Sequence, residues 1–230
     1  MMAVMEGHIY KAFDMELKEL KAKLLHEGGL VERAIQDAIK ALLERTSDIA
    51  KKVIEDDDLI NVLEIGIDEF CLKLLALRQP AARDLRFITT AIKINYDLER
   101  IGDMAVNISE RVLELNEEPQ LKPYIDLPTM ATIVQTMLKE SLDAFVREDV
   151  QLALKVTQDD QKVDNYHDQI FRELLTYMMQ DTRTISRATR LLFISKNLER
   201  IADHSVNIAE LVIFMVEGKI IRHLKYPPEE

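Results

Sequence analysis

Acidic side chains recur four residues apart at two matching places in the chain. Glu99 and Asp103 form one such pair, and Glu199 and Asp203 form the other. In a helix this spacing stacks the two carboxylates on one face, with their Cβ atoms about 6 Å apart. Their repulsion costs about 0.2–0.5 kcal/mol, and a cation held between them would offset it. The spacing therefore predicts metal binding, with an ordinary salt-bridged, solvated column as the alternative.

A second acidic column lies earlier in each half of the chain. It consists of Asp57 and Asn61 in the first half and of Asp160 and Asp164 in the second. Antiparallel pairing of neighbouring helices would bring these columns near the Glu/Asp pairs, and His167 would join the face in the second half. Oxygen ligands with an imidazole suit Mg, Mn, Fe or Zn. The first site is expected to be the weaker one, because Asn61 replaces a carboxylate.

An internal repeat relates the two sets of acids. Segments 94–110 and 194–210 are identical at 10 of 17 positions. Upstream the match continues with an offset of 103, which aligns Asp57 with Asp160. The shared apolar residues follow a helical 3–4 step and are explained by packing. The shared column of Glu99 and Asp103 is expected on the nominal solvent face, opposite that stripe.

The repeat and the turn residues predict an all-α fold made by tandem duplication of a three-helix bundle, with six long helices in two antiparallel bundles. The predicted helices span 8–45, 48–77 after an N-cap at Ser47, 81–115, 129–147, 150–180 after an N-cap at Asp149, and 182–217 before Gly218. Gly28-Gly29 is expected to kink or break the first helix. The predicted domains are 1–117 and 129–222, joined by a Pro-containing linker at 118–128 and followed by a disordered tail at 223–230.

Composition excludes several classes of protein. The net charge of −11 argues against nucleic acid as the main partner. Cys71 is the single cysteine, which excludes an intramolecular disulfide and Cys-rich metal sites and suits a reducing compartment. Apolar runs are too short for a membrane span, and the first residues lack the features of a signal peptide.

Catalytic motifs are equally scarce. Neither an E-x-x-H di-iron pattern nor H-E-x-x-H nor a Gly-rich phosphate loop occurs in the sequence. Cys71 lies among apolar residues and is interpreted as a small core residue rather than a nucleophile. His204 follows Asp203 but points about 100° away from it, which favours a surface or inter-helix role. The chain is therefore not expected to be an enzyme.

The repeated motifs resemble those of the PhoU family of phosphate-uptake regulators. The likeness is carried by D-L-E-R-I-G-D at 97–103, N-L-E-R-I-A-D-H at 197–204, A-R-D-L-R at 82–86 and the A-F-x-x-x-D segment at 144–149. It covers essentially residues 10–217. The resemblance implies two similar three-helix bundles, a cytoplasmic location, a homodimer and no enzymatic activity.

The resemblance also implies partners and ligands. Family members are accessory to the phosphate-specific ABC transporter, contact its ATPase subunit and the phosphate-sensing histidine kinase at the inner face of the membrane, and help repress the phosphate regulon when phosphate is plentiful. Some carry multinuclear metal clusters on E/D-x-x-x-D motifs. Carried over by position, the metal ligands would be Glu99, Asp103, Asp57 and Asn61 in the first bundle and Glu199, Asp203, Asp160 and Asp164 in the second.

Two other readings remain open at this point. The chain could be a metal-dependent enzyme or metal-storage bundle that uses the same carboxylate columns, or a purely structural helical scaffold. The enzyme reading needs a pocket with a perturbed acid or base beside the metal, and the residue pattern provides no such set.

Overall fold

The computed structural model describes residues 2–219, with side chains from residue 11 onward. In this range the chain forms α1 (Met2–Glu44), α2 (Ser47–Arg78), α3 (Ala82–Asn116), α4 (Asp126–Arg147), α5 (Val150–Gln180), the 3₁₀ turn η1 (Thr182–Thr184) and α6 (Ile185–Glu217). No strand occurs in the described residues, and the all-α prediction is confirmed. The tail predicted to be disordered, 223–230, lies outside them.

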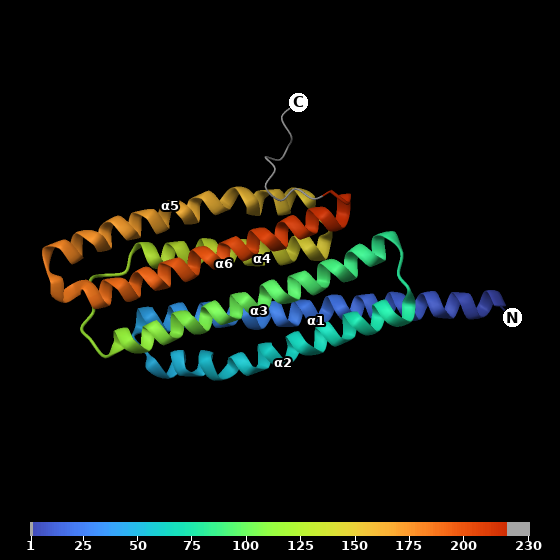
Figure 1. Ribbon diagram of the computed structural model, residues 1–230, viewed down its shortest axis with the longest axis horizontal. Helices are drawn as coiled ribbons and strands as arrows, with labels where there is room; N and C mark the ends of the chain where they lie inside the picture. Colours follow the sequence, from blue (N-terminus) through green and yellow to red (C-terminus); the bar gives the residue numbers. More distant parts are fainter. Residues whose placement is uncertain (1, 220–230) are drawn as a thin grey trace, which may run out of the picture.

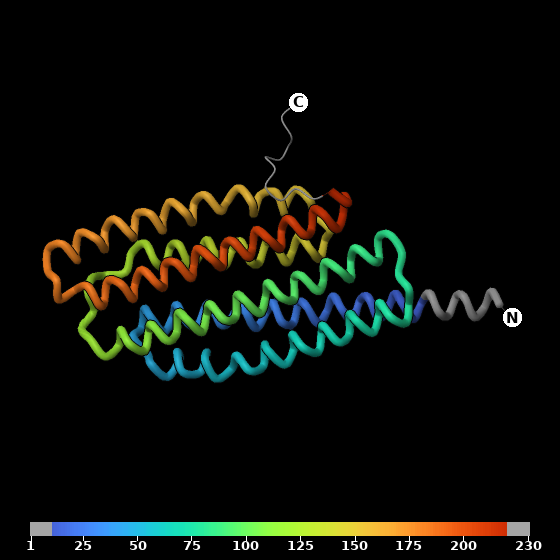
Figure 2. Tube along the Cα trace, in the orientation of Figure 1, coloured from blue at the N-terminus to red at the C-terminus, as the bar shows by residue number. Residues whose placement is uncertain are grey.

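The helices form two antiparallel bundles that lie against each other (Figure 1). Helices α1, α2 and α3 make the first bundle, and α4, α5 and α6 make the second (Figure 1). The two bundles meet mainly where α3 and α6 run side by side in opposite directions (Figure 1), with a smaller contact between α1 and α4. The chain trace in Figure 2 shows that α4–α6 repeats the path of α1–α3. The predicted duplication of a three-helix unit is therefore confirmed.

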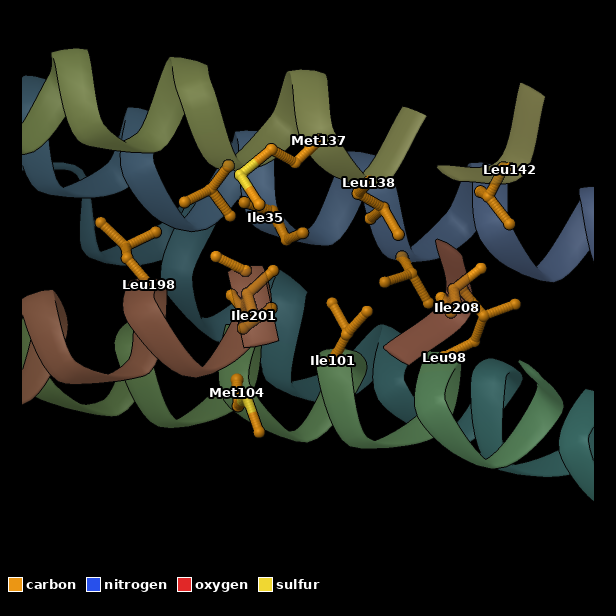
Figure 3. Packing of buried hydrophobic residues seen from close by; sticks show 14 of the residues in the cluster. Ile35, Leu98, Ile101, Met104, Met137, Leu138, Leu142, Leu198, Ile201 and Ile208 are labelled. Atoms are coloured by element: carbon orange, nitrogen blue, oxygen red, sulfur yellow. The ribbon is translucent and has the colours of Figure 1, made fainter. Parts of the chain in front are cut away.

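One hydrophobic core runs through both bundles. Leu98 and Ile101 of α3 are fully buried, and so are their repeat counterparts Leu198 and Ile201 of α6. These side chains gather with Ile35 of α1 in the same close-up of the core (Figure 3). The 3–4 spacing of the apolar residues thus gives α3 and α6 an apolar face that packs both within their own bundle and against the other bundle.

The break considered at Gly28-Gly29 does not occur, because α1 is a single helix from Met2 to Glu44. The reason for one of these glycines is a close approach between the bundles. A Cβ at Gly28 would lie 2.6 Å from Leu142 Cδ1 of α4, whereas a Cβ at Gly29 would have no neighbour within 4 Å. Gly28 therefore permits helix packing and does not end the helix.

Helix ends differ slightly from the sequence prediction. The N-cap of α2 is Thr46, so Ser47 is its first helical residue and not its cap. Helix α4 begins at Asp126, inside the predicted linker, because Pro128 falls in its first turn, where proline is tolerated. The predicted cap at Asp149 is confirmed, since its carboxylate accepts a hydrogen bond from the Leu152 N–H at 3.0 Å.

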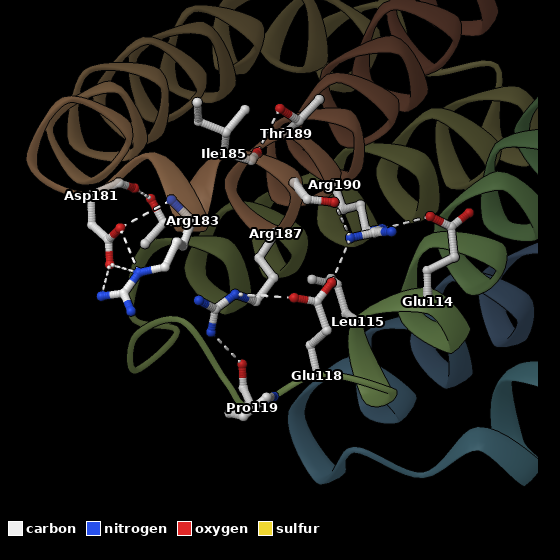
Figure 4. Close-up of polar contacts among 12 residues, drawn as sticks. Glu114, Leu115, Glu118, Pro119, Asp181, Arg183, Ile185, Arg187, Thr189 and Arg190 are labelled. Carbon is white, nitrogen blue, oxygen red and sulfur yellow. Dashed lines mark hydrogen bonds and ion pairs between the residues drawn. The ribbon is translucent and has the colours of Figure 1, made fainter.

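Polar contacts hold the bundles together at one end of the molecule (Figure 4). Arg190 of α6 contacts Glu114 of α3 at 2.6 Å and Glu118 of the connecting segment at 2.9 Å. Arg187 donates to the Pro119 carbonyl at 2.9 Å. These arginines fix the start of α6 against the segment that links α3 to α4.

Candidate metal centre

The first-bundle acids meet where α2 packs on α3. Asp57 of α2 lies against the α3 backbone, since a Cβ at Gly102 would be 3.4 Å from Asp57 Oδ1. The other oxygen, Asp57 Oδ2, accepts a hydrogen bond from Asn61 Nδ2 at 3.1 Å. Gly102 precedes Asp103 in the chain, so the two predicted columns come together as antiparallel pairing requires.

Electrostatic coupling supports this placement. Burial raises the pKa of the Asp57 carboxyl, the Asn61 amide lowers it, and the Asp103 charge raises it again. Burial also raises the pKa of Glu99, as do the charges of Asp103, Glu64 and Asp57, while Arg100 opposes the shift. Like charges are therefore crowded at this site, which is the condition that a bound cation relieves.

Arg100 already neutralises part of that charge. Its Nη1 atom donates to Asp103 Oδ2 at 2.9 Å, and its Nε atom lies 3.3 Å from Glu99 Oε2 in an ion pair. Within the part of the chain that the structure describes, this buried Glu99 oxygen makes no hydrogen bond. Arg100 also lies over the Tyr96 ring, 5.0 Å from its centroid. In the first bundle these acids are thus partly paired with arginine, as the alternative to metal binding predicts.

The second bundle repeats the arrangement with a denser set of carboxylates. Burial raises the pKa of Asp160 on α5 to about 6, with further contributions from Asp164, Asp203 and Glu199. The pKa of Asp203 is raised by burial and then by Glu199, while Lys196 opposes the shift. Lys196 forms an ion pair with Glu199 Oε2. The pKa of Asp160 is therefore raised by carboxylates of both α5 and α6.

The columns do not lie on the open solvent face that the helical wheel predicted. The Glu99 side chain is 20% exposed and Asp103 is 40% exposed. Residues of α2 cover this side of α3. In a three-helix bundle, less of each helix is therefore exposed to solvent than the apolar stripe of one helix, taken alone, predicts. The site is a half-buried seam between two helices.

The two histidines near the columns make contacts elsewhere. Nδ1 of His167 lies 2.8 Å from the buried Ser195 hydroxyl of α6. Nδ1 of His204 lies 2.7 Å from Asp97 Oδ1 of α3 and so joins the two bundles. The expected inter-helix role of His204 is confirmed, and His167 packs between α5 and α6.

The donor chemistry of both seams fits a hard or borderline cation. All the nearby predicted ligands offer oxygen atoms, and several of them are ionised acids at reduced exposure. As the side chains lie, no three His, Cys, Asp or Glu residues of the described range converge to hold a metal ion. A bound ion would therefore need water ligands or small side-chain rotations. The predicted ligand sets stay predictions.

Sequence reasoning missed one buried acid. Glu27 of α1 is fully buried, and neither carboxylate oxygen has a hydrogen-bonding partner among the described residues. It lies between Leu24 and Val31, which are both core residues. The sequence does contain a signal for it, because Glu27 occupies a position where the helical spacing of Leu24 and Val31 predicts an apolar core residue.

Cys71 is buried, and burial raises the pKa of its thiol to about 12, as expected for a core residue. Among the described residues, none of the helices has the length and apolar character that a bilayer span requires.

Comparison with known proteins agrees with the repeat and the fold. The family model of the PhoU domain matches twice, at residues 24–112 and 127–212. A phosphate-specific transport system accessory protein PhoU homolog of Pseudomonas aeruginosa is 46% identical over 218 residues, which cover 94% of this chain and 90% of that protein. PhoU of Escherichia coli K12, which carries the same accessory-protein name, is 39% identical over 217 residues, covering 94% and 90% of the two chains.

Two solved structures have the same architecture. The crystal structure of PhoU from Pseudomonas aeruginosa superposes with a TM-score of 0.87 at 47% identity, covering 90% of this chain and 100% of that one. The phosphate transport system regulatory protein PhoU from Streptococcus pneumoniae gives a TM-score of 0.85 at 32% identity, covering 90% and 98%. With two matching domains and relatives alike over nearly its whole length, this chain belongs to the PhoU family.

Proposed function

We propose that this chain is a non-enzymatic cytoplasmic regulator of phosphate uptake and phosphate signalling. As an adaptor it restrains the ATPase subunit of the phosphate-specific ABC transporter and helps the phosphate-sensing histidine kinase repress the phosphate regulon when phosphate is plentiful. The observation that carries the proposal is the PhoU domain, matched in both halves of a chain whose relatives are named accessory proteins of phosphate transport.

An exposed apolar stripe on α2 supports action by protein contact. Leu59, Val62, Ile65 and Leu72 are between 55% and 68% exposed and recur at helical spacing along one side of this helix. Single exposed apolar residues are ordinary, but an aligned set indicates a binding surface. The overall charge of −11 adds attraction to basic partner surfaces.

The adaptor proposal is tested by a pair of charge insertions. Val62→Glu with Ile65→Glu should weaken binding to the purified ATPase subunit or kinase by more than about tenfold, because two charges would be buried in the interface. Met179→Glu is the matched control, since Met179 is 80% exposed on α5, away from the stripe. Equal binding by all three proteins would exclude α2 as the contact surface.

The regulatory role itself is tested by deleting the gene in its native host. Phosphate-responsive genes should be expressed in high phosphate after deletion, and the intact chain should restore repression. Persistent repression in the deletion strain would contradict the proposed function, whatever the binding experiments show.

Metal binding at the two seams is part of the proposal. Glu99, Asp103, Asp57 and Asn61 would hold ions in the first bundle, and Glu199, Asp203, Asp160 and Asp164 in the second. Bound cations would compensate the crowded carboxylates and change the charge presented to a partner. Glu199→Ala with Asp203→Ala should lower the Fe, Zn, Mn or Mg content of the purified protein. An unchanged metal content would exclude the second site.

Self-association into a homodimer completes the proposal. Light scattering after size-exclusion chromatography should give twice the chain mass of 26.6 kDa, and a monomer mass would exclude the dimer.

A further inference from the structure

The buried acid Glu27 has no counterpart in the second bundle. Its side chain is 0% exposed, and both of its oxygens lack hydrogen-bonding partners among the described residues. Acidic side chains are almost never fully buried unless they are paired, and such a group calls for a specific explanation.

Glu27 is electrostatically coupled to other acids of the first bundle. Burial, followed by the charges of Glu64 and Asp68 on α2 and of Glu99 on α3, raises its pKa to about 9. Asn95 of α3 is also 0% exposed and lies against the same part of α2. Its Nδ2 atom donates to the Glu64 carbonyl and to Asp68 Oδ1, both at 3.0 Å.

Those two hydrogen bonds use the donors of the Asn95 amide and leave its carbonyl Oδ1 buried, with no partner from the residues that the structure describes. When Glu27 is ionised, the unsatisfied atoms of Glu27 and Asn95 are all oxygen acceptors. A set of buried acceptors with no donor is the complement of a hard cation.

The repeat shows that the fold does not require these acids. At the offsets of 103 and 100, Glu27 aligns with Met130, Glu64 with His167 and Asn95 with Ser195. In the second bundle Ser195 lies 2.8 Å from His167 Nδ1, and its hydroxyl donates to Met130 Sδ at 3.6 Å. The three matching positions thus contact one another in the second bundle, whereas in the first bundle both Glu27 oxygens and Asn95 Oδ1 lack hydrogen-bonding partners among the described residues.

We propose that Glu27, Asp68 and the Asn95 carbonyl form an interior site for a divalent, oxygen-preferring cation such as Mg²⁺ in the first bundle. The site lies between α1, α2 and α3 and is separate from the half-buried seam of Asp57 and Asp103. Mg²⁺ keeps several water ligands and takes one or two carboxylates, so it does not need three converging acids. In the absence of the cation a proton occupies Glu27.

The second bundle supplies the variants that test this site. Glu27→Met and Asn95→Ser each copy the residue that the fold already accommodates at the matching position. Asp103→Asn with Asp203→Asn removes a ligand from each seam and is the comparison variant. The full-length proteins are stripped with a chelator and titrated with MnCl₂ and MgCl₂. Bound ions per chain and the shift of the thermal midpoint are measured.

The interior site predicts that Glu27→Met binds about one ion fewer per chain than the wild type, with more than about tenfold weaker affinity at that site. Asn95→Ser should weaken the same binding step, and the seam variant should retain it. Identical ion counts and midpoint shifts in the wild type and in Glu27→Met would overturn the proposal, with Glu27 then a protonated buried acid only.

Loss of the step in the seam variant but not in Glu27→Met would also overturn it, and would assign the ion to the seams. Because neither result concerns phosphate-responsive expression, the interior site can fail while the proposed function stands. If Glu27→Met does not fold, Asn95→Ser gives the same decision.

Discussion

Glu27→Gln should make the stability of this protein less sensitive to pH. Burial and the neighbouring carboxylates raise the pKa of Glu27 from 4.5 to about 9. Between these two values the unfolded chain releases a proton that the folded chain keeps. The folded state therefore loses stability as pH rises, by about 1.4 kcal/mol per pH unit.

The expected size of the effect at neutral pH is substantial. Below the unfolded-state pKa the acid is neutral in both states and carries no ionisation cost. At pH 7 the accumulated loss is about 3 kcal/mol, a large part of the 5–15 kcal/mol that stabilises a typical domain. Glutamine has the shape of the neutral acid and cannot ionise. As pH rises, the free energy of unfolding of the variant should therefore increase relative to that of the wild type, by about 1.4 kcal/mol per pH unit.

The assay is urea unfolding followed by far-UV circular dichroism, because the chain is helical and has no tryptophan. Wild type and variant are compared from pH 5 to pH 8 in chelator, and the difference between them removes the contribution of all other titrating groups. Glu44→Gln, an exposed acid near the end of the same helix, is the control. A difference between wild type and Glu27→Gln that does not change with pH would refute the reasoning, because Glu27 would then be equally ionised in both states.

Three further predictions rest on single contacts. Gly29→Ala should stabilise α1 by about 1 kcal/mol, whereas Gly28→Ala should be less stable than Gly29→Ala by about 1–3 kcal/mol because its Cβ would press on Leu142; equal midpoints in urea would contradict this contact. Asp149→Ala should cost about 1 kcal/mol through loss of the cap of α5, and an unchanged midpoint would show that the cap adds nothing. Cys71 should react with a thiol reagent only after unfolding, because it is buried and its pKa is raised to about 12; rapid reaction of the native protein would contradict that burial.

The repeat made most of the fold predictable. Residues such as Leu98 and Leu198 occupy matching positions in two similar apolar patterns. Each pattern therefore supports the prediction of a helix with a buried face at the other. What the pattern could not provide was the environment contributed by distant segments. Leu142 explains Gly28, but the two are far apart in sequence, and adjacent glycines in isolation suggest a break.

The repeat also made the candidate site predictable, but again without the environment that distant segments contribute. Sharing of Asp103 and Asp203 between the halves indicated paired acids, and antiparallel helices were enough to place Asp57 and Asp160 beside them. A helical wheel describes one helix at a time, so it put these acids in solvent instead of in a seam. Glu27 was missed because comparing the repeats emphasises what the halves share, and this acid is a position where they differ.

The continuous core across α3 and α6 has a consequence for what one unit could do alone. A single three-helix unit would present to water the face of α3 or of α6 that the other unit now covers. The two units are alike, and the helices by which they meet, α3 and α6, run in opposite directions (Figure 1). Two separate copies of one unit could therefore cover each other in the same way. The covalent connection makes this association intramolecular, so it does not depend on protein concentration. The two halves can then diverge, as Glu27 and Met130 have, without losing the partner that each requires.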